Sequence, residues 1–436
     1  MSRNLTIQYQ LCVIAILSGT AAVPAFAQDR IAIRNVTVIS MDDSGVLDDH
    51  TVVVEDGRIT QVAPDSRVAI PDGAQVIDGK GKYLIPGLVD MHVHVNWEDS
   101  LLQFLVHGVT TVRNMAGFPN HRRWRREIES GERLGPTIFS ACRPIDGDTP
   151  HRLFPNRVPT VTVEQAEAAV QRAHTEGWQF IKVYDSVSPD VYNTILATAK
   201  VPVIGHVPFP VGLESVWAGR QHSIEHLQGY GPWLQPNGPV QVATISEHGR
   251  TWPTADVSRM PEAARRTVKA DVWNCPTMVL FSQLHTLEDF DAEVQRDPYR
   301  YASDRQIQHW RRRTQVMNPS IPIIRASIPM RMALLKALHA AGAQIVAGTD
   351  TGMPLVPTGL GLHWELKHFV DAGFSPLEAL HSATSRAAEC LGTEDFGIIR
   401  KGKRARSRAA QREPDRQHRK RLQDRWRDHT RSVEYS

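Results

Sequence analysis

The sequence is poor in cysteine and has no long apolar segment. Four of its 436 residues are cysteine, and removal of the leader peptide described below leaves three, Cys142, Cys275 and Cys390. This odd and sparse set excludes a disulfide framework and predicts buried core thiols. No segment reaches the roughly 18 apolar residues that cross a membrane, so we expect no membrane anchor.

Common catalytic motifs are also missing. The sequence contains neither a P-loop nor a G-x-S-x-G nucleophile elbow. His222 and His226 have the spacing of a zincin helix, but Glu225 precedes the second histidine instead of following the first. His363 and His381 fall in helical stretches and are expected to be ordinary surface or packing residues. The sequence therefore argues against P-loop enzymes, serine hydrolases of that type and zincins.

The net charge is small and unevenly distributed. The chain carries +3, from 50 Lys and Arg residues against 47 Asp and Glu residues. Residues 401–436 alone hold 13 basic and 5 acidic side chains, which leaves 37 basic and 42 acidic residues elsewhere. The body of the protein is therefore acidic, and no nucleic-acid partner is expected. With 41% hydrophobic residues, the chain can form two globular domains.

Residues 1–27 have the pattern of a cleaved export signal. Arg3 precedes an apolar run over residues 11–23, and Ala25-Phe26-Ala27 is the small-x-small pattern that a signal peptidase accepts. The alternative, a buried N-terminal helix, lacks an amphipathic pattern to support it. We expect an exported protein, located in the bacterial periplasm or secreted.

The rest of the chain predicts two kinds of structure. Short strands are expected at residues 31–40, 51–54, 58–62 and 75–77, separated by turn signals such as Glu55-Asp56-Gly57. After residue 84, apolar strands alternate with amphipathic helices, for example a helix that Thr162 and Gln165 would cap. This alternation predicts an α/β fold, a (β/α)8 TIM-type barrel, with a doubly wound sheet as the alternative. We assign residues 28–85 and 396–436 to a small β-sandwich domain and residues 86–395 to the barrel.

Side chains that can bind a metal or act as acids and bases lie in or after several successive apolar segments. His92 and His94 come after the expected strand 83–89, and residues two apart in a strand point the same way, so both can reach one metal ion. Further apolar segments contain or end at Lys182, His206, His226 and Asp350. The carboxyl ends of barrel strands meet at one face, which carries the active site. The set therefore predicts a metal or acid–base site on that face.

These residues, in this order, resemble the metal-dependent amidohydrolase superfamily, in particular its imidazolonepropionase-like and Xaa-Pro dipeptidase-like members. The resemblance covers about residues 30–400 and rests on Leu84-Ile85-Pro86-Gly87-Leu88-Val89-Asp90-Met91-His92-Val93-His94, followed by Lys182, His206, His226 and Ala347-Gly348-Thr349-Asp350. It implies two divalent metal ions, usually Zn²⁺. By position, His92, His94 and Asp350 would bind one ion and His206 and His226 the other. Lys182 would bridge the ions as a carbamate formed with carbon dioxide.

The resemblance also implies hydrolysis of a C–N bond in an amide or peptide-like small molecule. A metal-activated bridging hydroxide would attack the carbonyl, with Asp350 as general base and then general acid. Arg113, Tyr184 and Tyr230 lie where they could hold the substrate. A guanidinium suits a free carboxylate, although an internal ion pair with a barrel carboxylate is the alternative for Arg113.

Two other functions remain open at this point. A lactonase, esterase or phosphotriesterase-like hydrolase could use the same metal site, and the chain could be a non-catalytic or poorly folded remnant. A homo-oligomer is compatible with the sequence. The sequence does not specify the substrate or the metal.

The resemblance ends abruptly near residue 405. Superfamily members close with a phrase like F-G-x-I-x-x-G-K-x-A-D-L-V-L-L, and here Phe396-Gly397-Ile398-Ile399 and Gly402-Lys403-Arg404-Ala405 fit before a basic segment follows. Read one base later from Arg406, synonymous codons can encode the expected D-L-V-L-L. We therefore predict that the tail from about residue 405 arises from a frameshift, which the nucleotide sequence of the gene would test. A polyanion-binding tail and a solvated extension are the alternatives.

Overall fold

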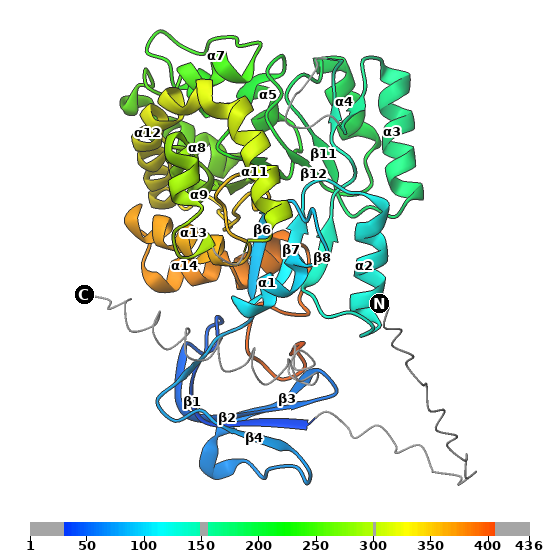
Figure 1. The fold of residues 1–436 in the computed structure, drawn as a ribbon, viewed down its shortest axis with the longest axis vertical. Helices are drawn as coiled ribbons and strands as arrows, with labels where there is room; N and C mark the ends of the chain where they lie inside the picture. The colour runs from blue at the N-terminus through cyan, green and yellow to red at the C-terminus, as the bar shows by residue number, and fades with distance from the viewer. Residues whose placement is uncertain (1–29, 149–155, 300–301, 406–436) are drawn as a thin grey trace, which may run out of the picture.

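The computed structural model describes residues 30–148, 156–299 and 302–405. Within these ranges, a small strand domain lies below a larger α/β domain in the view of Figure 1. The predicted export signal, residues 1–27, and the predicted frameshifted tail beyond residue 405 lie outside the described residues. None of the described helices is both long and apolar enough to cross a membrane.

The first domain contains a five-stranded sheet. Its strands are β1 (Arg30–Ile39), β2 (Val46–Glu55), β3 (Arg58–Pro64), β4 (Gln75–Asp78) and β5 (Tyr83–Leu84), in the order β3-β2-β1-β4 with β5 also paired to β1. The hairpin between β2 and β3 turns at Asp56 and Gly57, whose φ angles are 50° and 74°. Two successive positive φ angles are what a type I′ hairpin turn requires. The four strands predicted here are confirmed, and β2 is longer than expected.

The C-terminal end of the described chain returns to this sheet. Ile59 N donates a hydrogen bond to Lys403 O (2.9 Å), and Gly402 N donates to Ile59 O (2.7 Å). Ile399 is buried in the apolar cluster of the strand domain. The described residues form one sheet here and no second layer, so the predicted β-sandwich is not seen in them. The remaining strands of a sandwich were expected from residues beyond 405, outside the described ranges.

The larger domain has an α/β fold of the TIM-barrel type. Its parallel strands are β6 (Leu88–Val93), β7 (Val109–Asn114), β8 (Thr137–Ser140), β11 (Ile181–Val183), β12 (Val203–Gly205), β13 (Ser223–Glu225) and β14 (Trp273–Cys275), with β9 (Ile145–Asp146) and β10 (Val158–Pro159) alongside. Single parallel bridges join Ala141 to Phe180, Asn274 to Ile345 and Val93 to Thr351. The segment 344–351 is thereby placed between β14 and β6. The carboxyl ends of these strands therefore lie on one face.

Helices follow most of the strands and cover the barrel. They are α1 (Ser100–Val106), α2 (Pro119–Glu129), α3 (Val163–Thr175), α4 (Pro189–Thr198), α5 (Gly212–Ala218), α6 (Tyr230–Trp233), α7 (Ile245–Arg250), α8 (Met260–Lys269), α13 (Leu360–Asp371), α14 (Pro376–Ser382) and α15 (Ser385–Cys390). The predicted cap of α3 is confirmed, because Thr162 Oγ1 accepts from Gln165 N (3.3 Å) and Gln165 Oε1 accepts from Thr162 N (3.3 Å).

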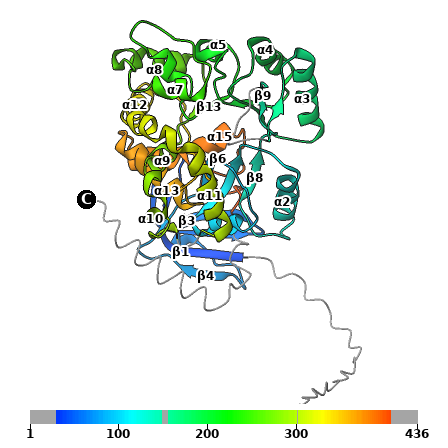
Figure 2. The ribbon, with the colours of Figure 1, turned by 45° about the horizontal axis from the view of Figure 1, so that its top comes forward.

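An insertion between β14 and the segment 344–351 forms a second, smaller apolar core. It consists of α9 (Met278–Leu284), α10 (Phe290–Glu293), α11 (Asp304–Met317) and α12 (Ile321–Ala340). Side chains of α9, α10 and α11 pack against Met353, Leu355 and Val356, which follow Asp350 closely. Figures 1 and 2 both place α11 near β6. The insertion therefore contacts the chain close to the predicted site.

Candidate metal centre

The predicted metal ligands lie at the carboxyl ends of the barrel strands. Lys182 lies in β11, His206 and His226 directly follow β12 and β13, and Asp350 lies in the segment after β14. His92 lies inside β6 and His94 directly after it. The strand predicted at 83–89 is wrong in its bounds, because Pro86, which has no backbone N–H to donate, and Gly87 separate β5 from β6.

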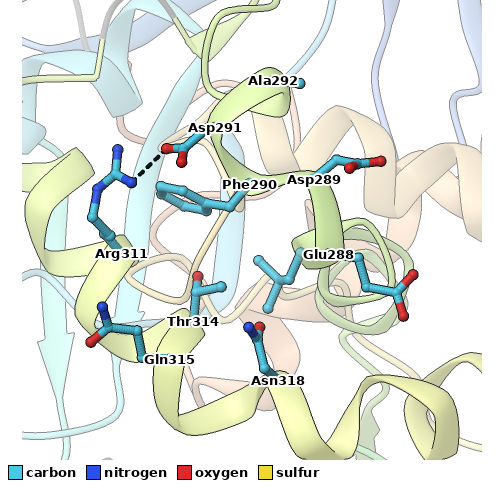
Figure 3. A pocket seen from close by; sticks show the side chains of 10 residues that line it. Glu288, Asp289, Phe290, Asp291, Ala292, Arg311, Thr314, Gln315 and Asn318 are labelled. Carbon is cyan, nitrogen blue, oxygen red and sulfur yellow. Dashed lines mark ion pairs between the residues drawn. The ribbon is translucent and has the colours of Figure 1, made fainter.

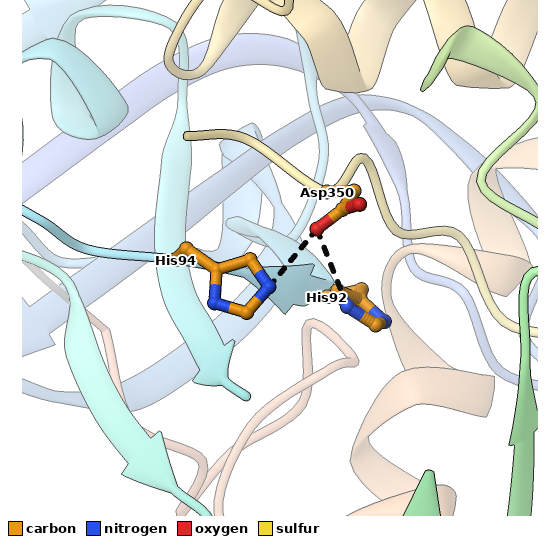
Figure 4. A group of neighbouring side chains, drawn as sticks. All are labelled: His92, His94 and Asp350. Atoms are coloured by element: carbon orange, nitrogen blue, oxygen red, sulfur yellow. Dashed lines mark ion pairs between the residues drawn. The ribbon is translucent and has the colours of Figure 1, made fainter. Parts of the chain in front are cut away.

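One carboxylate oxygen faces two histidines at the centre of this face (Figure 4). Asp350 Oδ1 lies 3.4 Å from Nε2 of His92 and 3.1 Å from Nε2 of His94. Nε2 of His92 and Oδ1 of Asp350 are buried without a hydrogen-bond partner. Such atoms are costly to bury without a partner. Two imidazoles and a carboxylate, with one atom of each converging, fit a divalent transition metal.

The other two predicted histidines and the lysine lie beside this group. The rings of His92 and His226 have centroids 4.5 Å apart, and those of His206 and His226 are 5.1 Å apart. Lys182 is 1% exposed, and its positive charge contributes to the lowered pKa values of both His92 and His226, after burial. The structure therefore brings all six predicted ligands together.

The backbone around these ligands is unusual. Asp350 and His226 have φ angles of 59° and 61°, in the left-handed region that non-glycine residues rarely adopt. Strained residues of this kind concentrate at functional sites. Gly205 precedes His206, and a Cβ there would lie 2.2 Å from Val183 O, so only glycine fits beside β11.

Three histidines of the centre each have Nδ1 held by a neighbouring side chain. The pairs are His92 with Glu225 Oε2 (2.7 Å), His206 with Asp185 Oδ1 (2.6 Å) and His226 with Thr277 Oγ1 (2.7 Å). A carboxylate only accepts hydrogen bonds, so the proton of His92 and of His206 lies on Nδ1. Nε2 then carries a lone pair that is available to a metal, an arrangement common around metal-binding histidines.

The electrostatics of the site follow from burial and from these neighbours. Burial lowers the pKa of His92 to about 4 and that of the Lys182 ammonium to about 8. Burial alone would raise the pKa of Asp350, but His92 and His94 outweigh it and hold that pKa well below its usual range. At neutral pH the site therefore contains a neutral imidazole at His92 beside an ionised Asp350 carboxylate, which are the forms that bind metals.

Two of the predicted substrate-binding residues, Arg113 and Tyr230, form hydrogen bonds inside the protein instead. Arg113 is completely buried and donates to Glu225 Oε1 (2.8 Å) and to Met91 O (2.7 Å). This ion pair is the alternative that the sequence analysis gave for Arg113. Because the guanidinium is fully buried, its N–H groups are not accessible to a substrate. The hydroxyl of Tyr230, which is also completely buried, lies within hydrogen-bond distance of Thr267 Oγ1 and donates to Asn274 Oδ1.

Tyr184, by contrast, lies at the candidate metal centre. Its ring stacks on His206 with 4.1 Å between centroids, so it covers one of the predicted ligands.

The described cysteines, Cys142, Cys275 and Cys390, are buried free thiols as predicted. Burial also raises the pKa of the Cys275 thiol well above its usual value, so that thiol is neutral in the metal-free protein.

The geometry agrees with the comparison to known proteins. The sequence model of the amidohydrolase family matches residues 83–406, more than half of the chain. The chain belongs to the amidohydrolase family. Members of this family are hydrolases that act on C–N bonds of small molecules and typically depend on metal ions. The superfamily resemblance seen in the sequence is therefore confirmed.

Individual amidohydrolases match this chain to different extents. An adenine deaminase of Paracoccus denitrificans is 33% identical over 89 residues, which cover 19% of this chain and 15% of the deaminase. The solved structure of a putative prolidase from Bifidobacterium longum is 26% identical, covers 86% of this chain and 87% of its own, and has a TM-score of 0.64. The bottromycin amidohydrolase is 24% identical, with a TM-score of 0.65 and coverage of 84% and 79%.

Proposed function

We propose that this amidohydrolase cleaves an amide or dipeptide-like C–N bond with two divalent metal ions, most suitably Zn²⁺. The observation that carries the proposal is the 3.4 Å separation of Nε2 of His92 and Oδ1 of Asp350, both buried and without a hydrogen-bond partner. Two ligand atoms bound to one tetrahedral zinc ion at about 2.0–2.1 Å would be separated by a similar distance. The spacing therefore supports a cation between them.

The ligand assignment follows from the positions of the side chains. His92, His94 and Asp350 would hold one ion, and His206 and His226 the other. Lys182 would supply an oxygen to each through a carbamate, and a lowered pKa favours the neutral amine that reacts with carbon dioxide. When bound, the two cations lower the pKa of a coordinated water and polarise the substrate carbonyl.

The chain's own groups would carry the proton transfers and keep the ligands aligned. Asp350 is ionised and can accept the proton of the attacking water, then deliver it to the leaving nitrogen. Glu225 and Asp185 fix the protons of His92 and His206 on Nδ1, away from the centre. Tyr184 covers His206 and limits access of solvent to that ligand.

An amide or dipeptide with a small-molecule leaving group is the substrate class that the comparisons favour. The putative prolidase matches most of both chains, whereas the match to the deaminase is confined to 89 residues. We further infer that the enzyme acts outside the cytoplasm, on the support of the signal-like residues 1–27.

The test is a panel of dipeptides, N-acyl amino acids, lactones, carboxylic esters and phosphotriesters, assayed with chelator-treated protein and after return of Zn²⁺. Hydrolysis of amides that returns with the metal would support the proposal. Hydrolysis confined to lactones, esters or phosphotriesters would assign the site to those reactions instead. Folded protein that binds no metal and hydrolyses none of the panel would contradict the proposal.

A further inference from the structure

Helix α11 presents two different stripes of side chains. Its buried residues recur at near-helical spacing and pack into the core of the insertion: Gln306, Trp310, Thr314 and Met317. Arg305, His309 and Arg313 are spaced four apart, so they share one face of the helix, next to the buried stripe. The packing of Trp310 and Met317 therefore fixes where this cationic stripe points.

A third side of α11 is turned to solvent. There Arg311 forms an ion pair with Asp291 (2.5 Å), at the wall of a pocket of about 480 Å³ that Thr314 and Gln315 also line (Figure 3). Arg312 is exposed as well. These arginines belong to the outer surface, and their side chains are separate from the stripe of Arg305, His309 and Arg313.

The cationic stripe contacts the loops that carry the metal ligands. The ring of His309 lies edge-on to Trp97, with 5.1 Å between centroids, and Trp97 follows His94 by three residues. Arg313 Nη1 donates to Sδ of Met353 (2.7 Å), and Met353 N in turn donates to the carbonyl of Asp350 (3.1 Å). Two loops of the centre, one after β6 and one at the end of the segment 344–351, thus meet this face of α11.

The charge of Arg313 reaches the centre itself. Burial lowers its pKa, and the Asp350 carboxylate and Tyr184 act in the opposite direction. The same guanidinium contributes, after burial, to the lowered pKa of His94. The positive charge of Arg313 therefore acts on Asp350, His94 and Tyr184.

His309 adds an independent observation on the same stripe. Its Nε2 is buried and has no hydrogen-bond partner. A buried ring nitrogen of this kind calls for a partner. It lies one helical turn from Arg313, so a single polar group could contact both side chains.

We propose that Arg313, with His309 beside it, binds the free carboxylate of the substrate, so that the enzyme acts on N-acyl amino acids or dipeptides with a carboxylate next to the scissile amide. A guanidinium presents two parallel N–H donors to a carboxylate. This inference rests on the proposed function, of which it specifies the substrate class. It also gives Arg313 the role that the sequence suggested for Arg113, which the structure places in an internal ion pair.

The experiment compares acids with their carboxamides. Binding of glycyl-L-proline, N-acetyl-L-methionine and the two corresponding C-terminal amides is measured by calorimetry on chelator-treated protein, and kcat/KM is measured after return of Zn²⁺. The variants are Arg313→Met, which keeps the apolar stem, Arg313→Lys, and the control Arg312→Met on the exposed face of the same helix. A lost charge-assisted hydrogen bond of about 1.5–3 kcal/mol corresponds to roughly 10- to 150-fold weaker binding of the acid.

The expected result is weaker binding and lower kcat/KM for the acids alone in Arg313→Met, partial recovery in Arg313→Lys, and no change in Arg312→Met. Equal losses for acids and amides would mean a structural role and overturn the inference, as would a wild-type protein that does not prefer acids. If the wild type binds the acids selectively and Arg313→Met loses that preference, but none of the probes is hydrolysed, the proposed function fails while carboxylate binding by Arg313 is still supported.

Discussion

The carboxylate of Glu225 lies 2.7 Å from Nδ1 of His92, and neither side chain has any exposed surface. The other oxygen of the same carboxylate accepts from Nη2 of Arg113 (2.8 Å), which is equally buried. Glu225 therefore connects the fully buried guanidinium of Arg113 to His92 of the candidate metal centre. The hydrogen bond fixes the proton of His92 on Nδ1 and directs the lone pair of Nε2 toward Asp350.

We expect Glu225→Gln to destabilise the protein and to weaken metal binding. Removal of one partner of a buried ion pair leaves Arg113 as an uncompensated buried charge, which costs about 3–5 kcal/mol in free energy of unfolding. Loss of the carboxylate behind a metal-binding histidine typically weakens metal affinity by about 10- to 100-fold. Urea denaturation and a competitive zinc titration would measure the two effects. Glu214→Gln, which affects an exposed ion pair with Arg266, is the control, and equal behaviour of the two variants would refute the prediction.

Lys182→Met should lower the amount of metal that the folded protein binds. Methionine matches the apolar stem of the buried lysine but cannot form a carbamate, so the two ions would lose their shared ligand. Elemental analysis of dialysed protein is expected to show less metal per chain than in the wild type. Lys367→Met, at an exposed ion pair on α13, should retain the wild-type content. Unchanged metal in Lys182→Met would remove Lys182 from the ligand set.

Asp350→Asn should leave a folded protein with little hydrolytic activity. An amide cannot accept the proton of the attacking water, and loss of general acid–base catalysis costs about 10²- to 10⁴-fold in rate. The measurement is kcat for the best amide of the panel, with metal content determined in parallel. Asp371→Asn, on the exposed end of α13, serves as the matched variant. A kcat within a few-fold of the wild type would exclude Asp350 as the proton carrier.

The sequence could place the predicted ligands on one face because they lie at positions that the fold dictates. His92 and His94 alternate on an extended segment, and Lys182 and Asp350 belong to apolar segments whose carboxyl ends share one face of a barrel-type sheet. Local rules were equally sufficient for the cap at Thr162 and for the turn at Asp56 and Gly57. For the cap and the turn, the determining interactions lie within a few residues along the chain.

The carboxylates that hydrogen-bond to the predicted histidine ligands were not predicted, because each is remote in sequence from its histidine. Glu225 is 133 residues from His92, and in the sequence it stood out only as a misplaced zincin glutamate. Asp185 could have been noticed, since it follows Lys182 by three residues at a strand end, but its pairing with His206 needs the neighbouring strand. Arg113 shows the reverse case: its position at a strand end is right for a substrate, yet Glu225 binds it in the interior.

Lys182 should also give the metal-free protein an unusual dependence of stability on pH. Burial lowers the pKa of its ammonium from 10.5 to about 8 in the folded protein. Between these two values the unfolded chain binds more protons than the folded one, so the free energy of unfolding rises with pH. A shift of this size corresponds to about 3 kcal/mol across the window.

Urea denaturation of chelator-treated protein at a series of pH values from about 7.5 to 10.5 would test this dependence. Other lysines and the tyrosines titrate in the same range, so the informative quantity is the difference between the wild type and Lys182→Met. Methionine carries no charge, and the variant should lose the rise that Lys182 contributes. The gap between the two proteins is then expected to change in favour of the wild type as pH increases. Parallel curves would show that Lys182 has an ordinary pKa and that burial does not prepare its amine for carbamate formation.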